Sequence, residues 1–256
     1  MRKTKHIIRD IIGYCYYNTM KRFQNIGNRC LIYHAFGTRL KHDSYGISIN
    51  INKFKDQMKF LNDHYKMTDI NDFTSDDVTI SISIDDGYKD TNDAINILNN
   101  YNIPFTLFIT AGKINQKGYL SDTDIYNISQ IKNSIIGTHG MSHNRFEKMN
   151  YSSQFKELKD SKLILQNIIK EEINITSYPH GSFDKNTTDI LSKLGYKWAA
   201  CSKKGFNSFS TDNFLLCRSE IIASDTIIDL TNKIKQNLIL VGVSSYIFLF
   251  LQTCKG

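Results

Sequence analysis

Hydrophobic and polar positions follow two alternating patterns along the chain. Short runs rich in hydrophobic residues predict β-strands, while stretches with a hydrophobic residue every three or four positions predict α-helices. The predicted strands are 30–33, 78–84, 105–109, 135–138, 198–200 and 215–217, and segment 173–175 leads into a turn at Pro179. The predicted helices are 52–65, 91–101, 153–169, 187–194 and 226–234.

Strands that alternate with helices predict a parallel sheet with helical crossovers, and therefore an α/β barrel. In such a barrel the carboxyl ends of the strands open onto one common mouth. Polar residues follow several predicted strands: His34, Asp85, Asp86, His139 and His180. We expect these side chains to converge at the mouth, although they lie far apart in the sequence.

The composition is that of one folded domain. The chain has 256 residues, of which 41% are hydrophobic and 22% charged, so it can bury a large core and is not disordered. Two prolines are too few for a proline-rich linker. Segment 111–130 is expected to form pocket-lining loops, and its sequence carries no pattern that identifies a substrate.

The formal net charge is +7, and most of the excess lies at the start of the chain. Residues 1–29 carry seven basic side chains and one acidic one. A solvated basic helix and a segment that contacts an anionic membrane surface both remain open for this region. No basic stripe interleaved with aromatic residues occurs, so the sequence argues against nucleic-acid binding.

The cysteines and the absence of a signal-like segment predict a cytoplasmic protein. The five cysteines are scattered without the spacing of a metal or redox motif, which favours reduced thiols. No uninterrupted apolar core of signal-peptide length occurs near the start. Residues 238–251 carry no charge but are short for a helix that crosses a bilayer. One or two buried strands are the first interpretation of this tail, and a membrane-dipping segment is the second.

Candidate chemistry comes from two short motifs considered together. Asp85 and Asp86 alone would suit an ordinary turn, and His139 and His143 alone would suit a protein surface. In combination, one carboxylate and two imidazoles can hold a zinc-like ion and leave a coordination position open for water. A second carboxylate beside them can take a proton from that water. The set predicts metal-assisted hydrolysis.

These motifs resemble those of the polysaccharide deacetylases of carbohydrate esterase family 4. That family carries Thr-Phe-Asp-Asp-Gly, then His-Ser/Thr-x-x-His, then a Pro-x-Gly turn. This chain has Ser-Ile-Asp-Asp-Gly at 83–87, His-Gly-Met-Ser-His at 139–143 and Pro-His-Gly at 179–181. Segment 102–109 is similar to the family's Ile-Pro-Ala-Thr-x-Phe strand, and 194–196 to its Leu-Gly-Tyr. The resemblance extends over residues 30–235.

The resemblance implies a fold and a set of metal-site roles. The implied fold is a distorted (β/α) barrel of about seven strands at residues 30–237, between a basic segment 1–29 and an apolar tail 238–256. Asp85 is the implied general base, and the implied metal ligands are Asp86, His139 and His143. Zinc is the expected ion, and cobalt or nickel would suit the same ligands.

The substrate-binding turn and the general acid are also implied by resemblance. The turn comprises Tyr178, Pro179, His180 and Gly181, with the backbone N–H at His180 stabilising the oxyanion. Many family members supply the acid from a late Leu-x-His motif, but this chain has no histidine after His180. A circularly permuted branch, resembling the poly-N-acetylglucosamine deacetylases, carries it early in a Tyr-His motif. Tyr33-His34 matches that motif, so His34 is the candidate acid. His180 is the substitute, and a packing role for His34 stays open.

Two positions depart from the family pattern. Gly140 replaces the usual Ser or Thr, and Ser177 stands where many members have an Arg that orients the base. Arg218 matches another family position and is a candidate to take over that orienting role. Neither departure removes a metal ligand.

The resulting expectation is a metal-dependent N-deacetylase that acts on an N-acetylated sugar in the biosynthesis of a cell-envelope surface polysaccharide. We expect it in the cytoplasm, with peripheral contact at the inner membrane face as an additional expectation. Two alternatives remain open: a deacylase that removes another group, such as formyl, from a lipid-linked amino sugar, and a non-catalytic carbohydrate-binding protein. The oligomeric state cannot be predicted from the sequence.

Overall fold

Seven parallel strands form the main sheet of the protein, in the order β7-β6-β5-β4-β3-β1-β8. The structure is a computed structural model that describes residues 27–40, 43–44, 46–73 and 77–235. The strands are β1 (Gly27–Tyr33), β3 (Val78–Ile84), β4 (Phe105–Ile109), β5 (Ser134–Thr138), β6 (Ile175–Ser177), β7 (Trp198–Ala200) and β8 (Arg218–Glu220). The short strand β2 (Lys66–Met67) pairs with β3 outside this order.

The sheet curls into a nearly closed barrel. Every pair of neighbouring strands is parallel, and a parallel bridge from Ala200 to Leu216 links the end of β7 to the segment that leads into β8. Since β7 and β8 are the two ends of the strand order, this bridge almost closes the sheet on itself. The predicted (β/α) barrel of about seven strands is confirmed.

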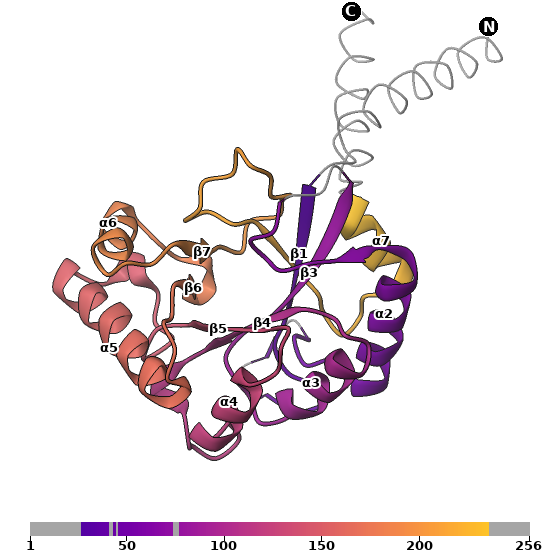
Figure 1. The fold of residues 1–256 in the computed structure, drawn as a ribbon, viewed down its shortest axis with the longest axis horizontal. Coiled ribbons are helices and arrows are strands. Elements are labelled where there is room, and N and C mark those ends of the chain that lie inside the picture. Colours follow the sequence, from indigo (N-terminus) through magenta and orange to yellow (C-terminus); the bar gives the residue numbers. More distant parts are fainter. Residues whose placement is uncertain (1–26, 41–42, 45, 74–76, 236–256) are drawn as a thin grey trace, which may run out of the picture. The chain divides into compact units, whose positions relative to one another are not determined.

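Helices cover the outside of the barrel in chain order (Figure 1). They are α2 (Ile51–His64), α3 (Thr91–Asn100), α4 (Asp122–Ser129), α5 (Tyr151–Ile169) and α6 (Lys185–Lys193). Residues 27–225 form this compact unit, and the last described helix, α7 (Ile227–Lys235), belongs to a second unit. The barrel unit contains every predicted site residue.

The helices bury the hydrophobic faces that their sequence periodicity indicates. In α2 the buried residues include Phe54, Met58 and Leu61, which are three or four positions apart and therefore share one face. The strands β3 and β4 are buried along nearly their whole length, as expected of parallel strands covered on both sides. This packing fixes the ends of the strands, and the loops that follow them, in space.

Most predicted elements are confirmed to within two or three residues, but the last strand is not. β8 begins at Arg218, whereas the apolar run 215–217 was predicted as strand and forms only the bridge at Leu216. The N–H of Cys217 instead donates to the side chain of Asn207, 2.7 Å away. A buried arginine begins the strand because a carboxylate neutralises it, as described below.

Segment 111–130 is more regular than predicted. It contains a short 3₁₀ turn at Ala111–Lys113 and the helix α4. Ser121 caps α4 by accepting from the N–H of Asp124, whose carboxylate accepts in return from the Ser121 N–H. This reciprocal pair is a sequence signal for a helix start that the periodicity alone did not bring out.

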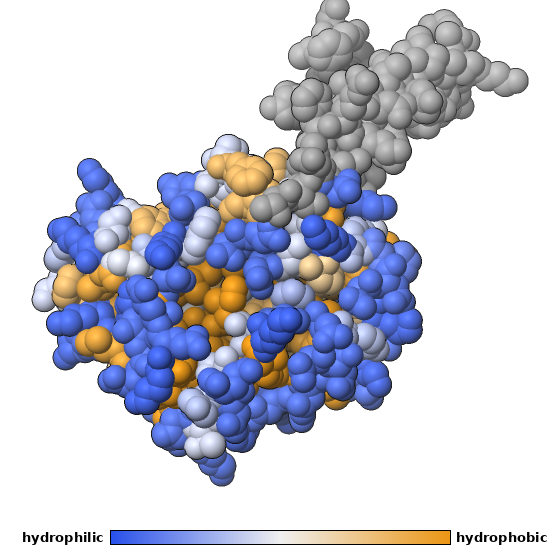
Figure 2. Space-filling model, viewed as in Figure 1, coloured by the Kyte–Doolittle hydropathy of each residue, from blue (hydrophilic) through white to orange (hydrophobic). Residues whose placement is uncertain are grey.

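The predicted basic segment 1–29 lies almost wholly outside the described residues, apart from its last three residues in β1, and the apolar tail 238–256 lies wholly outside them. Among the helices of the described part, none is long and apolar enough to cross a membrane. The domain boundaries at 29 and 237 stay predictions. On the face of the molecule shown in Figure 2, hydrophobic side chains gather near the centre within a largely hydrophilic rim.

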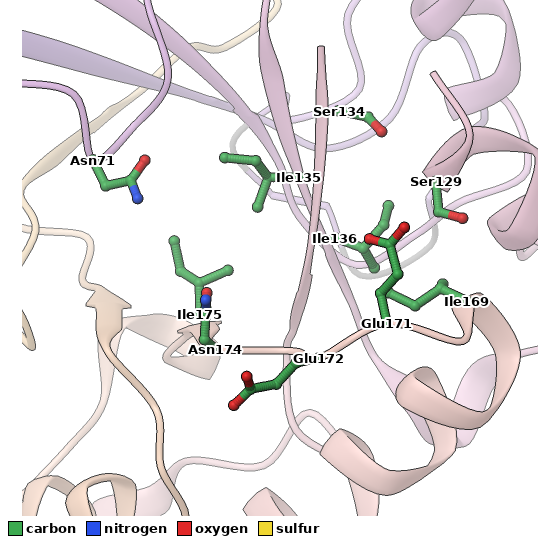
Figure 3. Close-up of a pocket in the computed structure, with 10 residues that line it drawn as sticks. All are labelled: Asn71, Ser129, Ser134, Ile135, Ile136, Ile169, Glu171, Glu172, Asn174 and Ile175. Carbon is green, nitrogen blue, oxygen red and sulfur yellow. The ribbon is translucent and has the colours of Figure 1, made fainter. Parts of the chain in front are cut away.

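A cavity of about 240 Å³ lies at the amino ends of β5 and β6 (Figure 3). Ser134 and Ile175, the first residues of these two strands, contribute to its wall, together with Glu171 and Glu172. The polar residues singled out from the sequence follow the opposite, carboxyl ends of the strands. The candidate site residues therefore lie at the opposite end of the barrel from this cavity.

Candidate active site

Four strands deliver the predicted site residues at their carboxyl ends. His34 follows β1, Asp85 and Asp86 follow β3, and His139 follows β5. The turn that begins at Tyr178 follows β6. Because the strands are parallel and in register, residues that directly follow them reach the same mouth of the barrel.

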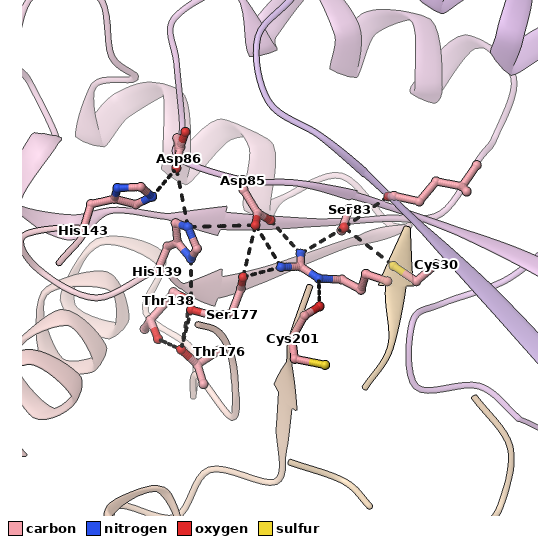
Figure 4. Close-up of polar contacts among 12 residues, drawn as sticks. Cys30, Ser83, Asp85, Asp86, Thr138, His139, His143, Thr176, Ser177 and Cys201 are labelled. Atoms are coloured by element: carbon pink, nitrogen blue, oxygen red, sulfur yellow. Dashed lines mark hydrogen bonds and ion pairs between the residues drawn. The ribbon is translucent and has the colours of Figure 1, made fainter. Parts of the chain in front are cut away.

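Asp86, His139 and His143 form a compact cluster (Figure 4). Oδ1 of Asp86 lies 3.4 Å from Nε2 of His139 and 3.1 Å from Nε2 of His143. One ligand atom from each of the three residues lies within 4.8 Å of the other two. These spacings are compatible with one ion held between a carboxylate oxygen and two imidazole nitrogens.

The environment of His139 fixes which of its nitrogens faces the cluster. Its Nδ1 lies 2.9 Å from the carbonyl oxygen of Ser177, which can only accept, so Nδ1 carries the hydrogen. Nε2 then presents a lone pair toward Asp86. Burial lowers the pKa of His139 to about 4, so the ring is neutral at pH 7. A neutral imidazole oriented by a backbone carbonyl is the form that binds metals.

Asp86 is held in an unusual backbone conformation with an unpartnered oxygen. Its φ of +74° lies in the left-handed region, which turns its carboxylate away from the neighbouring Asp85 and toward the two imidazoles. Burial favours a raised pKa for Asp86, but the His143 and His139 rings outweigh it and hold that pKa well below its usual range. Its Oδ1 is buried and has no hydrogen-bond partner among the described residues. A cation is the natural partner for such an oxygen, so these residues fit a divalent metal.

Helix α5 holds the loop that carries the two histidines. Oε2 of Glu157 accepts from the N–H groups of Met141, at 2.7 Å, and Ser142, at 2.9 Å. Gly140 has a φ of +68°, and a Cβ there would lie 3.2 Å from the same oxygen. The glycine that departs from the family pattern therefore suits the close approach of Glu157, a residue that the sequence analysis did not identify.

Asp85 makes a different set of contacts from its neighbour. Its two oxygens accept from the two terminal nitrogens of Arg218, at 2.7 and 2.9 Å. Both side chains are buried, and Arg218 also donates to the carbonyl oxygen of Cys201, at 3.1 Å. Burial acts to raise the pKa of Asp85, but the Arg218 charge outweighs it, so that pKa is lowered. The carboxylate is thus kept ionised and oriented.

Ser177 connects the carboxylate of Asp85 to the histidine cluster. Its hydroxyl lies 3.1 Å from Oδ2 of Asp85 and 2.6 Å from Nη2 of Arg218. Its carbonyl oxygen is the acceptor for His139. Nε2 of His139 is 3.9 Å from Oδ2 of Asp85. The Asp85 carboxylate therefore lies close to the Asp86–His139–His143 cluster but is not part of it.

The turn after β6 places His180 beside the cluster. His180 and Gly181 both have left-handed backbone conformations, with φ of +58° and +64°. The N–H of Gly181 donates to the carbonyl oxygen of Tyr178, at 2.8 Å. The ring centroids of His180 and His143 are 4.5 Å apart. Within the described residues, the N–H of His180 donates to no backbone carbonyl. The Tyr178 side chain is fully buried and its hydroxyl donates to the carbonyl of Phe214, so it supports the turn from inside.

His34 is close to the site but is not bonded to it. Its ring interacts electrostatically with Asp85 and Asp86. Its Nδ1 is buried without a hydrogen-bond partner among the described residues. The structure thus brings together the predicted ligands, the predicted base and Arg218, and it leaves His34 at the edge of the group. Ser83, whose Oγ accepts from Nη1 of Arg218 at 3.1 Å, completes the surroundings together with Ser177 and Glu157, and their contacts could not be predicted from single residues in the sequence.

Comparison with known proteins agrees with this fold and site. The family model for polysaccharide deacetylases matches residues 73–199. The protein YxkH of Bacillus subtilis (strain 168), whose name assigns it provisionally to the polysaccharide deacetylases, is 26% identical over 203 residues. That match covers 75% of this chain and 70% of YxkH.

Solved structures of low sequence identity share the fold. The deacetylase PplD of Streptococcus pyogenes, solved in complex with acetate, superposes with a TM-score of 0.73 at 21% identity and covers 82% of this chain and 99% of its own. IcaB from Ammonifex degensii gives a TM-score of 0.72 at 16% identity, with 83% and 98% covered.

An α/β barrel with a carboxylate–imidazole cluster at the carboxyl ends of its strands can perform metal-assisted hydrolysis. The family match and the relatives agree with it, and the chain belongs to the polysaccharide deacetylase family. Family membership implies a carbohydrate substrate.

Proposed function

We propose that this protein is a metal-dependent hydrolase that removes N-acetyl groups from an N-acetylated sugar. The observation that carries the proposal is the separation of two adjacent carboxylates. Asp86 faces two imidazoles within 4.8 Å, while Asp85 is held ionised by Arg218 immediately beside them. A ligand set next to an independent base is what hydrolysis with an activated water needs.

Asp86, His139 and His143 would hold the divalent metal, with zinc as the proposed ion and cobalt or nickel as alternatives. When bound, such an ion lowers the pKa of a water ligand from 15.7 to about 7 and polarises a carbonyl oxygen. The approach of Asp86 Oδ1 to both imidazoles, at 3.1 and 3.4 Å, and the lone pair of His139 Nε2 support this assignment.

Asp85 is the proposed general base. Its Oδ2 lies 3.9 Å from Nε2 of His139, so a water between the cluster and Asp85 is within reach of this oxygen. Arg218 and Ser177 hold the carboxylate at a fixed angle, and a fixed base contributes more to catalysis than a mobile one. Asp85 accepts the proton of the water as the water attacks the acetyl carbonyl.

The backbone N–H of His180 is the proposed oxyanion donor. The left-handed turn next to His143 supports this role, because a preorganised backbone donor stabilises the charge that develops on the carbonyl oxygen. His34 is the proposed general acid, which protonates the sugar nitrogen as it leaves. Its place after β1, its unpartnered Nδ1 and its interaction with both carboxylates support this role.

The test is the release of carboxylic acid from a panel of N-acylated sugars by metal-loaded protein. The panel contains N-acetylhexosamine oligomers, nucleotide-linked and lipid-linked N-acetyl sugars, and the N-formyl counterpart of each. Acetate release that stops on chelation and returns with zinc is the expected result. Formate release alone would transfer the proposal to a deformylase with the same machinery.

A non-catalytic carbohydrate-binding protein is disfavoured by a specific observation. Binding a glycan requires neither a base nor a metal, whereas Asp85 is buried with a dedicated arginine and lies beside a complete ligand set. A well-folded, metal-bound protein that releases no acid from any substrate in the panel would favour this second function.

We further propose that the protein acts in the biosynthesis of a surface polysaccharide, in the cytoplasm and in peripheral contact with the inner membrane face. The free thiols of Cys30 and Cys201, both buried, suit a reducing compartment. Sedimentation of the full chain with anionic vesicles would support membrane contact. A protein that stays in the supernatant at low salt would remove that part of the proposal.

A further inference from the structure

A cavity of about 380 Å³ opens beside the Asp86–His139–His143 cluster, and basic side chains line the cavity. Its wall comprises Asn144, Arg145, Lys148, Met149 and His180. No acidic residue contributes to this wall. The cavity therefore presents two positive charges and several polar groups, which is the composition of an anion-binding surface.

His180 joins this cavity to the catalytic cluster. Its ring forms part of the cavity wall and lies 4.5 Å from the ring of His143, a proposed metal ligand. A molecule whose acyl group lies at the cluster can therefore reach past His180 into the cavity. The two sites are close enough to hold neighbouring parts of one substrate.

The fold places both cations on the same side of one turn. Arg145 precedes and Lys148 ends the 3₁₀ turn η2 (Phe146–Lys148). Arg145 itself has an extended backbone, and its side chain and that of Lys148 line the same cavity. Lys148 also donates its N–H to the carbonyl of Arg145, 3.2 Å away.

Two contacts hold the η2 turn in place, one through the Phe146 ring and one through the Glu147 backbone. The Phe146 side chain is fully buried and meets the ring of Tyr178 edge-on, with centroids 6.5 Å apart. The N–H of Glu147 donates to Oγ of Ser182, at 3.3 Å. Because Tyr178 and Ser182 also flank the His180 turn, these contacts fix the backbone of η2 relative to that turn.

The charges in the cavity are poorly neutralised by the protein itself. Arg145 lies 3.8 Å from Glu147, with both side chains 46% exposed, and an exposed pair of this kind contributes little. Lys148 forms no ion pair within the described part of the chain. Both side chains are available to an anionic ligand.

We propose that Arg145 and Lys148 bind a phosphate group of the substrate, so that the enzyme prefers a phosphorylated amino sugar to a neutral polymer. The planar guanidinium of Arg145 can engage two phosphate oxygens at once, and Lys148 adds a second charge. The inference rests on the proposed deacetylase function and specifies its substrate class. The phosphate belongs to a nucleotide-linked or a lipid-linked sugar, which share this chemistry.

The first experiment measures binding without turnover. Metal-loaded Asp85→Asn protein is titrated with N-acetylglucosamine 1-phosphate and with the uncharged methyl N-acetylglucosaminide. We expect the phosphorylated sugar to bind at least about tenfold more tightly, and Arg145→Gln/Lys148→Gln to abolish that preference. The matched control is Lys55→Gln/Lys132→Gln, which removes the same charge from exposed positions elsewhere and should preserve it. Equal binding of the two sugars would overturn the inference.

The second experiment measures turnover by enzyme that retains Asp85, with and without the same charge substitutions. UDP-N-acetylglucosamine and a short-chain polyprenyl diphosphate N-acetylglucosamine distinguish the nucleotide from the lipid source, and a neutral oligomer is the reference. The cavity variant should lower kcat/KM for the phosphorylated substrates about tenfold, mainly through KM, and leave the neutral oligomer unchanged. Higher kcat/KM on the neutral oligomer would refute the inference while leaving the deacetylase function intact. Phosphate-dependent binding with no acid release from any sugar would instead refute the deacetylase function.

Discussion

At the scale of single residues, two adjacent aspartates are given different roles by their surroundings. Asp85 faces a buried arginine and a serine hydroxyl, while Asp86 turns through a left-handed backbone toward two imidazoles. Neighbouring carboxylates would normally repel each other and share a proton. Here Asp85 faces the charge of Arg218, and Asp86 faces two imidazole rings. These contacts support the proposed assignment of Asp85 as base and Asp86 as metal ligand.

Replacing Arg218 should change the pH dependence of catalysis. Activity requires ionised Asp85, so it is lost as the pH falls through the pKa of that carboxyl. The Arg218 charge outweighs burial and lowers this pKa, so Arg218→Gln should raise it and move the acid limb of kcat/KM to higher pH. The measurement is the pH profile of kcat/KM, with Arg218→Lys, which keeps the charge, as the control. An acid limb that does not move would exclude Asp85 as the titrating base.

Replacing His34 should slow only those reactions that need a protonated leaving group. His34→Ala is expected to lower kcat for an N-acetyl sugar by about 10²–10⁴-fold while the metal stays bound. An activated aryl acetate, whose leaving group needs no proton, should react nearly as fast as with the unaltered protein.

His180→Asn is the matched variant for His34→Ala, since Asn tolerates the left-handed backbone at this position. It preserves the proposed oxyanion N–H and should lower kcat for the same sugar much less than His34→Ala does. Undiminished turnover by His34→Ala, with a large loss in His180→Asn, would assign the acid role to His180.

At the scale of elements, the sequence predicts those features that repeat along the chain. The alternation in 78–84 and the helical spacing in 91–101 each correspond to an element within a residue. The proximity of the proposed ligands Asp86 and His139 was predictable for a related reason, since both come just after parallel strands. Their convergence comes from the topology, which period and order already indicate.

Contacts between distant segments could not be predicted in the same way. Arg218 begins a strand and pairs with Asp85 across 133 positions; the family resemblance predicted this orienting role, whereas a single charged residue after an apolar run gives no sign of it. Ser177 works through both its hydroxyl and its carbonyl, so its residue type alone carries little information. Such tertiary pairings override local propensity, which explains the misplaced strand at 215–217.

Helix α5 should control metal affinity through the histidine loop. Glu157→Ala removes the acceptor for the Met141 and Ser142 N–H groups, and we expect metal affinity to fall about 10–100-fold. Glu157→Gln retains an acceptor oxygen and should recover part of the loss. Lys156→Ala, an exposed neighbour on α5, is the control for the helix itself. Metal titration by calorimetry is the measurement, and equal affinity in Glu157→Ala and Lys156→Ala would refute this role.

At the scale of the whole molecule, the candidate site residues gather at one end of the barrel. The amino ends of β5 and β6 border one cavity, and the carboxyl ends carry the proposed base, the proposed metal ligands and the basic cavity. Segments from position 34 to position 218 contribute to one site because parallel strands bring their ends together. We therefore expect that single substitutions at the carboxyl end of the barrel can separate metal binding from catalysis.

The most direct measurement follows zinc binding and acetate release together, in metal-stripped protein titrated with zinc. In the unaltered protein, acetate release should rise in proportion to bound zinc up to one ion per chain. Asp85→Asn should bind zinc as tightly but lose activity by about 10²–10⁴-fold, while His143→Ala should lose both zinc affinity and activity. Full activity without zinc, or undiminished activity in Asp85→Asn, would contradict the central claim that a metal cluster and an independent carboxylate base perform the hydrolysis.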